Sequence, residues 1–277
     1  MAVNISLMTR DDLDFAKALT DAENWGYLRS DFERLIDLAP DGCFVARGLL
    51  RRVGIIATTR HGDYGFPGTL IVMKNHRHSG IGEALFARAM AYLKDRGTKT
   101  IELNGVFPAV SLYRRFGFQD KYLSLRFARP SSPYDGKSGE LLAATTEEIV
   151  RFDREHLQID RSAVLTRFCD DFRESLIAVG DGQLSAYAFV KSRANGSVDV
   201  GPLVAKSPDV AIALLKTILS RFHDKPILIG VPEMKVSFVQ ALLAEGFLYK
   251  SPFLRMYSGV RLDLDDHTYV IISPDKG

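Results

Sequence analysis

Residues 70–82 read Leu70-Ile71-Val72-Met73-Lys74-Asn75-His76-Arg77-His78-Ser79-Gly80-Ile81-Gly82, and this segment gives the strongest indication of the fold. An apolar segment at 68–73 predicts a strand, and a basic turn connects it to a helix predicted at 79–96, where an apolar residue recurs every four positions. The first N–H groups of a helix lack intrahelical partners, and the helix dipole is positive at that end. Gly80 and Gly82 carry no Cβ, so a phosphate can approach the backbone. The stretch therefore predicts an anion-binding loop.

Other glycine-rich phosphate loops do not fit this sequence. A P-loop ends in Gly-Lys-Ser/Thr, whereas Gly82 is followed by Glu83-Ala84. A dinucleotide-binding loop needs a third glycine, where this chain has Leu85, and an acidic residue about 20 positions further on, for which Glu102 is a weak candidate. The remaining pattern is Arg-x-x-Gly-x-Gly, formed by Arg77, Gly80 and Gly82.

The segments on either side of the loop alternate between strand and helix patterns. Before it we expect a strand at 5–8, helices at 11–22 and 28–38, and a hairpin of 42–47 and 52–60. After it we expect a strand at 99–103, a helix at 108–116, and a return to the sheet at Gly117-Phe118. This order predicts an α/β fold with a mixed sheet.

The loop and the helix that follows the next strand together resemble the GNAT superfamily of N-acetyltransferases. Val72 lies five residues before Arg77, at the end of an apolar strand, as in that family. The later helix carries the family's Ala-x-x-x-Tyr pattern followed by Gly-Phe, in Ala109, Tyr113 and Gly117-Phe118. The resemblance implies a GNAT fold, acetyl-CoA as the acetyl donor and acetyl transfer to an amine.

The resemblance also implies roles for individual residues. The family's strand before the loop separates from its neighbour, so the backbone near Ile71 and Val72 would bind the pantetheine arm and the thioester carbonyl. Arg77 would add a fixed positive charge. Tyr113 would donate a proton to the coenzyme A sulfur, although it could instead only pack its helix against the sheet. The residues whose N–H groups would hold the pyrophosphate are His78, Ser79, Gly80, Ile81 and Gly82.

The acceptor side is less defined by the sequence. Trp25 lies where related tandem proteins often have a tryptophan in a substrate-facing helical region, and Asp31 is a second candidate for contact with the acceptor. The candidates for a general base are Asp31, His61, Asp63 and Glu102, and removal of the proton through water is the alternative. Asn104-Gly105-Val106-Phe107 replaces the Asp-Ala-Thr string of the tandem group, which leaves the shape of the acceptor site open.

The second half of the chain repeats landmarks of the first at nearly constant spacing. The matching landmarks are 45–48 with 177–180, 70–72 with 203–204, and 116–118 with 245–247. Residues 201–205 and Arg255-Met256 resemble a tandem group in the GNAT superfamily. After Ala205 the chain reads Lys206-Ser207-Pro208, without a glycine loop, so we expect one cofactor site.

The segment at 129–139 is rich in Pro, Ser and Gly, which predicts a domain boundary. We expect an N-terminal GNAT domain with the acetyl-CoA loop at 1–130 and a degenerate C-terminal GNAT-like domain at 137–277. The predicted class is α/β (α+β), with two tandem GNAT-like domains, each a mixed, mostly antiparallel twisted sheet flanked by helices.

The composition of the chain limits the classes of binding partner that we expect. The chain has 277 residues, with 36 Lys and Arg against 34 Asp and Glu, which gives no reason to expect nucleic acid or a membrane as a partner. No leader pattern or membrane-length apolar run is present, and Cys43 and Cys169 have no disulfide or metal-ligand spacing. We expect a cytoplasmic monomer or homodimer without a metal, since His76 and His78 are explained by the anion loop.

The predicted activity is direct transfer of acetyl from acetyl-CoA to a primary amine of a small molecule. Two alternatives remain open at this point. One is an acyl-CoA-binding module or sensor that does not catalyse transfer. The other is a peptide or protein N-acetyltransferase.

Overall fold

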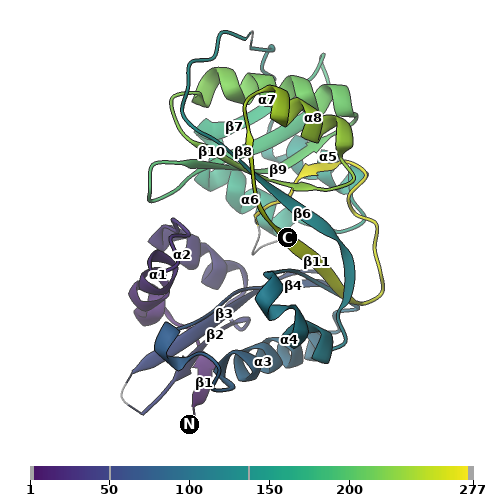
Figure 1. The fold of residues 1–277 in the computed structure, drawn as a ribbon. Helices are drawn as coiled ribbons and strands as arrows, with labels where there is room; N and C mark the ends of the chain where they lie inside the picture. The colour runs from purple at the N-terminus through teal and green to yellow at the C-terminus, as the bar shows by residue number, and fades with distance from the viewer. Residues whose placement is uncertain (1–2, 50, 137, 274–277) are drawn as a thin grey trace.

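The computed structural model describes residues 3–49, 51–136 and 138–273 (Figure 1). The strands of the first half are β1 (Asn4–Leu7), β2 (Cys43–Arg47), β3 (Arg52–His61), β4 (Tyr64–Val72), β5 (Thr100–Gly105) and β6 (Gln119–Arg129). Its helices are η1 (Arg10–Asp12), α1 (Leu13–Asp21), α2 (Arg29–Leu38), η2 (Lys74–His76), α3 (Ile81–Asp95), η3 (Phe107–Ala109) and α4 (Val110–Arg115). The elements predicted from periodicity are all present, with ends shifted by a few residues.

The second half begins with helices and continues as alternating strands and helices. Its strands are β7 (Leu176–Val179), β8 (Ala186–Ser192), β9 (Val198–Ala205), β10 (Ile227–Pro232), β11 (Leu248–Gly259) and β12 (Thr268–Val270). Its helices are α5 (Thr146–His156), α6 (Ser162–Asp171), η4 (Arg173–Ser175), α7 (Pro208–Phe222) and α8 (Val236–Ala244).

The strands form one sheet in the order β1-β2-β3-β4-β5-β11-β6-β10-β9-β8-β7, with β12 paired to β9. The order β7-β8-β9-β10 repeats β2-β3-β4-β5, and β9–β10 is a parallel pair like β4–β5. The sequence landmarks match this repeat, because 45–47 lie in β2 and 177–179 in β7, while 70–72 lie in β4 and 203–204 in β9. The structure therefore has two mixed, mostly antiparallel halves of the same topology, flanked by helices.

The two halves exchange the long strands β6 and β11. β11 lies between β5 and β6, and β6 lies between β11 and β10. In Figure 1 these two long strands connect the lower, N-terminal half to the upper, C-terminal half. The predicted boundary falls between the end of β6 at Arg129 and the start of α5 at Thr146, and residue 137, the predicted start of the second domain, lies outside the described residues.

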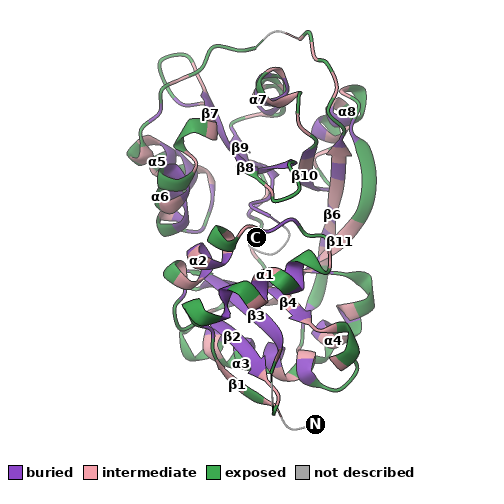
Figure 2. Cartoon of the chain, turned by 90° about the vertical axis from the view of Figure 1, so that its left-hand side faces the viewer, coloured by how far each residue is buried: buried purple, intermediate pink, exposed green. Residues whose placement is uncertain are grey.

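Helices cover both faces of the sheet, so central strands are apolar on both sides (Figure 2). In β2, Cys43 and Val45 pack toward α1 and α2, while Phe44 and Ala46 pack toward α3. Cys43 and Cys169 are free, buried thiols. Burial raises the pKa of Cys43 to about 12, so it acts as a small apolar core residue.

No helix in the described ranges has both the length and the apolar character needed to cross a bilayer. The longest, α3 and α7, each have 15 residues.

Candidate functional site

The predicted anion loop lies between the end of β4 and the start of α3. Gly80 is the N-cap of α3 with φ +83°, a conformation that favours glycine, and His78 has φ +59°. Ser79 Oγ donates a hydrogen bond to His76 O at 2.6 Å. Ala84 N–H donates to Gly80 O within α3, and the N–H groups that precede it belong to the first turn. The loop therefore presents a helix N-terminus to solvent.

The space in front of the two loop glycines is open. A Cβ added at Gly80 would meet no atom within 4 Å, and one added at Gly82 would lie 3.7 Å from Val72 Cγ2. Arg77 crosses the end of β4, where its Nε donates to Val72 O at 3.0 Å. Its Nη2 donates to Glu23 Oε1 at 2.5 Å, which links the loop to the segment after α1.

β4 and β5 separate beyond their first residues. Their register pairs are Tyr64 with Thr100 and Gly65 with Ile101. On its other edge β4 contains a bulge, because pairing with β3 passes from Gly68 to Ile71, and Thr69 has φ +52°. The wedge between β4 and β5 opens into a cavity lined by residues 67–70 of β4. The strand separation that the family resemblance implied is present.

Ile71 and Val72, the predicted pantetheine contacts, pair with β3 at Ile55 and Gly54. Neither is among the residues that line the cavity, whereas Pro67, Gly68, Thr69 and Leu70 are. Sequence reasoning missed these four residues. Pro and Gly adjacent in an otherwise apolar strand are a signal of a bulge that could have located them.

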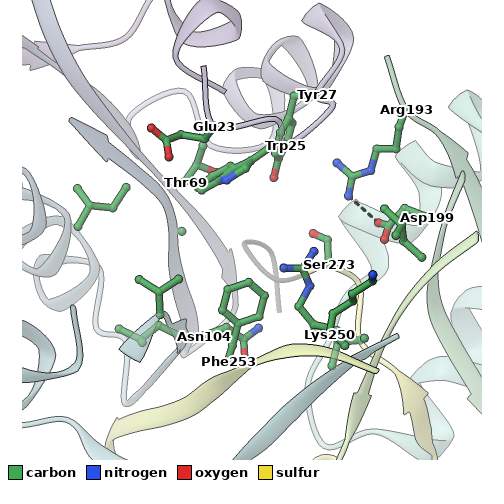
Figure 3. Close-up of a pocket in the computed structure, with 18 of the residues that line it drawn as sticks. Glu23, Trp25, Tyr27, Thr69, Asn104, Arg193, Asp199, Lys250, Phe253 and Ser273 are labelled. Atoms are coloured by element: carbon green, nitrogen blue, oxygen red, sulfur yellow. Dashed lines mark hydrogen bonds and ion pairs between the residues drawn. The ribbon is translucent and has the colours of Figure 1, made fainter. Parts of the chain in front are cut away.

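The cavity has a volume of about 340 Å³ and lies between the two halves (Figure 3). Its walls come from the wedge, from the segment after α1, from the exchanged strands, and from the second half. The lining residues with polar or aromatic side chains include Glu23, Asn24, Trp25, Tyr27, Asn104, Tyr113, Arg126, Arg193, Asn195, Asp199, Lys250, Phe253 and Ser273.

Tyr113 reaches this cavity from α4. Its ring packs 5.1 Å from the ring of Phe86, and a Cβ added at Gly105 would lie 3.0 Å from it. Burial raises the pKa of Tyr113 to about 12, so its hydroxyl stays protonated at neutral pH. In the part of the chain that the structure describes, no hydrogen bond is formed by this hydroxyl. It is therefore available to a ligand in the cavity.

The two predicted acceptor-side residues lie in different places. Trp25 lines the cavity, with its ring centroid 6.1 Å from that of Tyr27. Asp31 accepts from Leu28 N–H at 2.9 Å and pairs with Arg34 at 3.0 Å, so it caps α2 and is not a lining residue. The structure thus brings Trp25 and Tyr113 to one cavity and places Asp31 outside it. The predicted anion loop is linked to the lining residue Glu23 through Arg77.

The other candidates for a general base also lie away from the cavity lining. Asp63 is exposed in the β3–β4 turn and pairs with Lys99 at 3.1 Å. Glu102 is fully buried and accepts from Arg255 Nε at 2.8 Å and Lys121 Nζ at 2.9 Å. His61 is buried at the end of β3. In the described ranges, no group of three or more His, Cys, Asp or Glu side chains is placed to hold a metal ion.

His61 is expected to make the fold sensitive to acid. Burial, with the nearby Arg161, lowers the pKa of His61 from 6.5 to about 4. Between these pH values the unfolded chain binds a proton at His61 that the folded chain excludes. The contribution of His61 to the free energy of unfolding is therefore fully present above pH 6.5, and about 3 kcal/mol is lost as the pH falls to 4. Urea unfolding at pH 7 and pH 4.5 should show this loss reduced in His61→Gln. The control His223→Gln should keep it, and an equal loss in both variants would contradict the assignment.

The corresponding slot of the second half is filled by the chain itself. β9 and β10 pair in parallel as far as Val200 and Ile229. Beyond that point β12 pairs with β9, and Ile271 N–H donates to Gly230 O at 3.0 Å. A Cβ added at Gly201 would lie 2.0 Å from Ile271 O, which shows how closely the segment is inserted. The space that corresponds to the β4–β5 wedge is thus occupied.

The buried Lys191 holds this segment from the adjacent strand. Its Nζ donates to Gly201 O at 2.6 Å and to Ile272 O. The helix that follows β9 also lacks an open N-terminus, because Ser207 Oγ accepts from Val210 N–H at the start of α7. Both features support the expectation of one cofactor site in the chain.

Family models match both halves. A model described as the acetyltransferase (GNAT) family matches residues 13–118, and one described as an acetyltransferase (GNAT) domain matches residues 149–270. A comparison with curated proteins gave no match.

Solved structures share the fold over almost the whole chain. A protein from Pyrococcus horikoshii is 23% identical, with a TM-score of 0.84, and the match covers 99% of this chain and 96% of that chain. A tandem GNAT protein from the clavulanic acid biosynthesis pathway is 15% identical, with a TM-score of 0.67 and coverages of 95% and 100%. A GCN5-related N-acetyltransferase from Sphaerobacter thermophilus is 12% identical, with a TM-score of 0.68 and coverages of 94% and 96%. With both halves matched by its models, the chain belongs to the GNAT acetyltransferase family and carries two GNAT domains in tandem.

Proposed function

We propose that this protein transfers an acetyl group from acetyl-CoA directly to a primary amine of a small molecule. Family membership supports acyl transfer from an acyl-CoA. The observation that carries the finer proposal is the arrangement of an unpaired strand edge and the Tyr113 hydroxyl at one cavity, with the open N-terminus of α3 linked to the lining residue Glu23 through Arg77.

The residues present fit coenzyme A. The N–H groups of His78, Ser79, Gly80, Ile81 and Gly82 would hold its pyrophosphate, with the charge of Arg77 beside them. The edge of β4 that faces the wedge, from Pro67 to Val72, would hold the pantetheine arm through its backbone. Acetyl-CoA would supply a thioester whose carbonyl carbon accepts the amine.

The proton balance assigns Tyr113 a role. The amine nitrogen forms a bond to the acetyl carbon, the carbon–sulfur bond breaks, and the sulfur takes up a proton. Tyr113 is protonated at neutral pH because of its raised pKa, so it can supply that proton or a hydrogen bond. Glu23 and Asp199 are the carboxylates among the described lining residues, and each is in an ion pair. We infer that the amine loses its proton through water.

Cavity size favours a small acceptor. A volume of about 340 Å³ is at the lower end of small-molecule sites, which span about 300–1,000 Å³. Both halves contribute walls, so the acceptor would be enclosed between them. A sensor that catalyses no transfer would not need the Tyr113 hydroxyl to be available as an acid in the cavity. A protein acceptor would not need a cavity enclosed by both halves.

Tyr113→Phe is expected to lower kcat about a hundredfold at saturating amine, while the Kd for acetyl-CoA changes little. The reason is that general acid catalysis contributes about 10²–10⁴ in rate, whereas the ring that packs against Phe86 is kept. Thiol release and calorimetry measure the two effects. Tyr92→Phe, on α3, is the matched control and should behave as the unmodified protein. Unchanged turnover in Tyr113→Phe would remove the acid role.

A panel of acceptors tests the activity itself. Thiol release from acetyl-CoA would be measured with small primary amines and with peptides that have free N-termini or lysines. Release with small amines supports the proposal. Binding of acetyl-CoA without release on any acceptor would favour the sensor, and release on peptides alone would favour protein acetylation.

A further inference from the structure

One wall of the cavity is cationic. Arg126 on β6 and Lys250 on β11 are direct partners in the antiparallel register of these strands, and both line the cavity. Arg193, from the turn between β8 and β9, lines it as well. Figure 3 shows Arg193 and Lys250 extending into the same space from different segments of the chain. The acid on this wall is Asp199, which pairs with Arg193 at 2.9 Å.

Two of these cations have no carboxylate of their own. Among the described residues, neither Arg126 nor Lys250 forms an ion pair, and the guanidinium carbon of Arg126 lies 4.9 Å from the centre of the Phe253 ring. Like charges directly opposite on neighbouring strands are destabilising. Burial lowers the pKa of Arg126, and Arg193 acts in the same direction while Asp199 opposes it. Arg126 and Lys250 therefore repel each other, and a bound anion would offset this repulsion.

The cationic wall and the β4–β5 wedge border the same cavity. The wedge contributes Leu70 and Asn104, and α4 contributes Tyr113, while Arg126 and Lys250 lie on the exchanged strands. Aromatic side chains border the space between them, with Trp25 on one side and Phe253 across the cavity in Figure 3. A ligand that spans this space would meet the acetyl group at one end and positive charge at the other.

We propose that the acceptor is a primary amine that also carries a carboxylate or phosphate group, and that Arg126 and Lys250 bind this anionic group. The inference rests on the proposed acetyl transfer, since it assigns the acceptor of the same site. A polyamine would place further positive charge against these cations, so the same observation argues against that class. Arg126 offers a planar pair of donors and Lys250 a compact charge, which together suit an oxyanion.

The test compares matched amines that differ in the anionic group. In the phosphate arm, phosphoethanolamine is compared with ethanolamine, and in the carboxylate arm β-alanine is compared with propylamine. We expect kcat/KM to be at least about tenfold higher for the anionic member of one arm, which identifies the group. Equal or higher kcat/KM for both neutral amines would overturn the inference while leaving acetyl transfer intact.

Variants locate the effect. Arg126→Met and Lys250→Met should each raise KM for the preferred anionic amine about tenfold and leave KM for its neutral partner unchanged. Arg151→Met and Lys216→Met remove exposed cations on α5 and α7 and serve as matched controls. An anionic preference that persists in the Arg126→Met/Lys250→Met double variant would exclude the assigned residues.

Binding separates this inference from the proposed function. Calorimetric titration with phosphoethanolamine and β-alanine requires no turnover. If no amine is acetylated but one of these ligands binds and the double variant loses that binding, the anion subsite stands and acetyl transfer fails. If neither ligand binds to the protein, with or without coenzyme A, and neutral amines are acetylated, the anion subsite fails alone.

Discussion

Gly82→Asp is expected to weaken acetyl-CoA binding at least about a hundredfold while the fold stays intact. The substitution places a carboxylate at the start of α3, where the pyrophosphate would accept hydrogen bonds from main-chain N–H groups. Each such bond to a charged group contributes about 1.5–3 kcal/mol, so loss of even two accounts for the change. The side chain has room, because a Cβ at this position would lie 3.7 Å from Val72 Cγ2.

Calorimetry with acetyl-CoA measures the affinity and the stoichiometry. The unmodified chain should bind one equivalent, because the chain's own segment around β12 occupies the corresponding slot of the second half. Gly48→Asp, in the β2–β3 turn, is a matched control that should leave both values unchanged. Thermal unfolding reports whether each variant folds. A folded Gly82→Asp variant with unaltered affinity would place the binding site of acetyl-CoA elsewhere.

Arg255→Met is expected to destabilise the protein by about 3–5 kcal/mol, the range for breaking a buried ion pair. Arg255 lies on β11 and is 4% exposed. Its Nε donates to Glu102 Oε2 at 2.8 Å, and its Nη2 donates to the Tyr64 hydroxyl at 3.1 Å. Because β11 belongs to the second half and Glu102 to the first, these bonds anchor the exchanged strand. Loss of Arg255 leaves the Glu102 carboxylate, 0% exposed, with one cationic partner fewer.

Urea unfolding of the full chain gives the free energy of unfolding. Arg154→Met, which removes an exposed ion pair with Asp160, is the matched control and should cost no more than about 1 kcal/mol. Glu102→Gln/Arg255→Met should recover part of the loss, since the uncompensated charge is removed as well. If Arg255→Met lowers the free energy of unfolding no more than the control does, the bonds of Arg255 to Glu102 and Tyr64 do not hold β11 in the first half.

Local patterns in the sequence predicted the fold class and the strand–turn–helix segment at which we expect an anion to bind. The apolar repeat in 79–96 predicted α3, which the structure places at Ile81–Asp95. Gly80 was chosen from the sequence because it lacks a Cβ, and the structure adds that its φ is positive, a conformation that favours glycine. The repeated landmarks predicted two copies of one topology, since each landmark occupies the same place in the strand order of its half.

Features that depend on distant residues were not predictable in this way. Asp31 and Glu102 were candidates for chemistry, but their carboxylates have structural partners in Leu28 N–H and Arg255. Arg126 and Lys250 are separated by most of the second half in sequence, and only the strand exchange makes them neighbours. No periodicity or motif marks either residue as part of a site.

Residue type and periodicity therefore predicted local features: the helices, the strands, and the glycine-containing turn at the start of α3. The tertiary structure decided which strands would be exchanged, what fills the second slot, and which charges face the cavity. Local features can be predicted because backbone preferences and the hydrogen bonds of helices and turns act within a few residues. The features that the tertiary structure decided arise from strand pairing and burial between segments that are distant in sequence, such as β5 and β11.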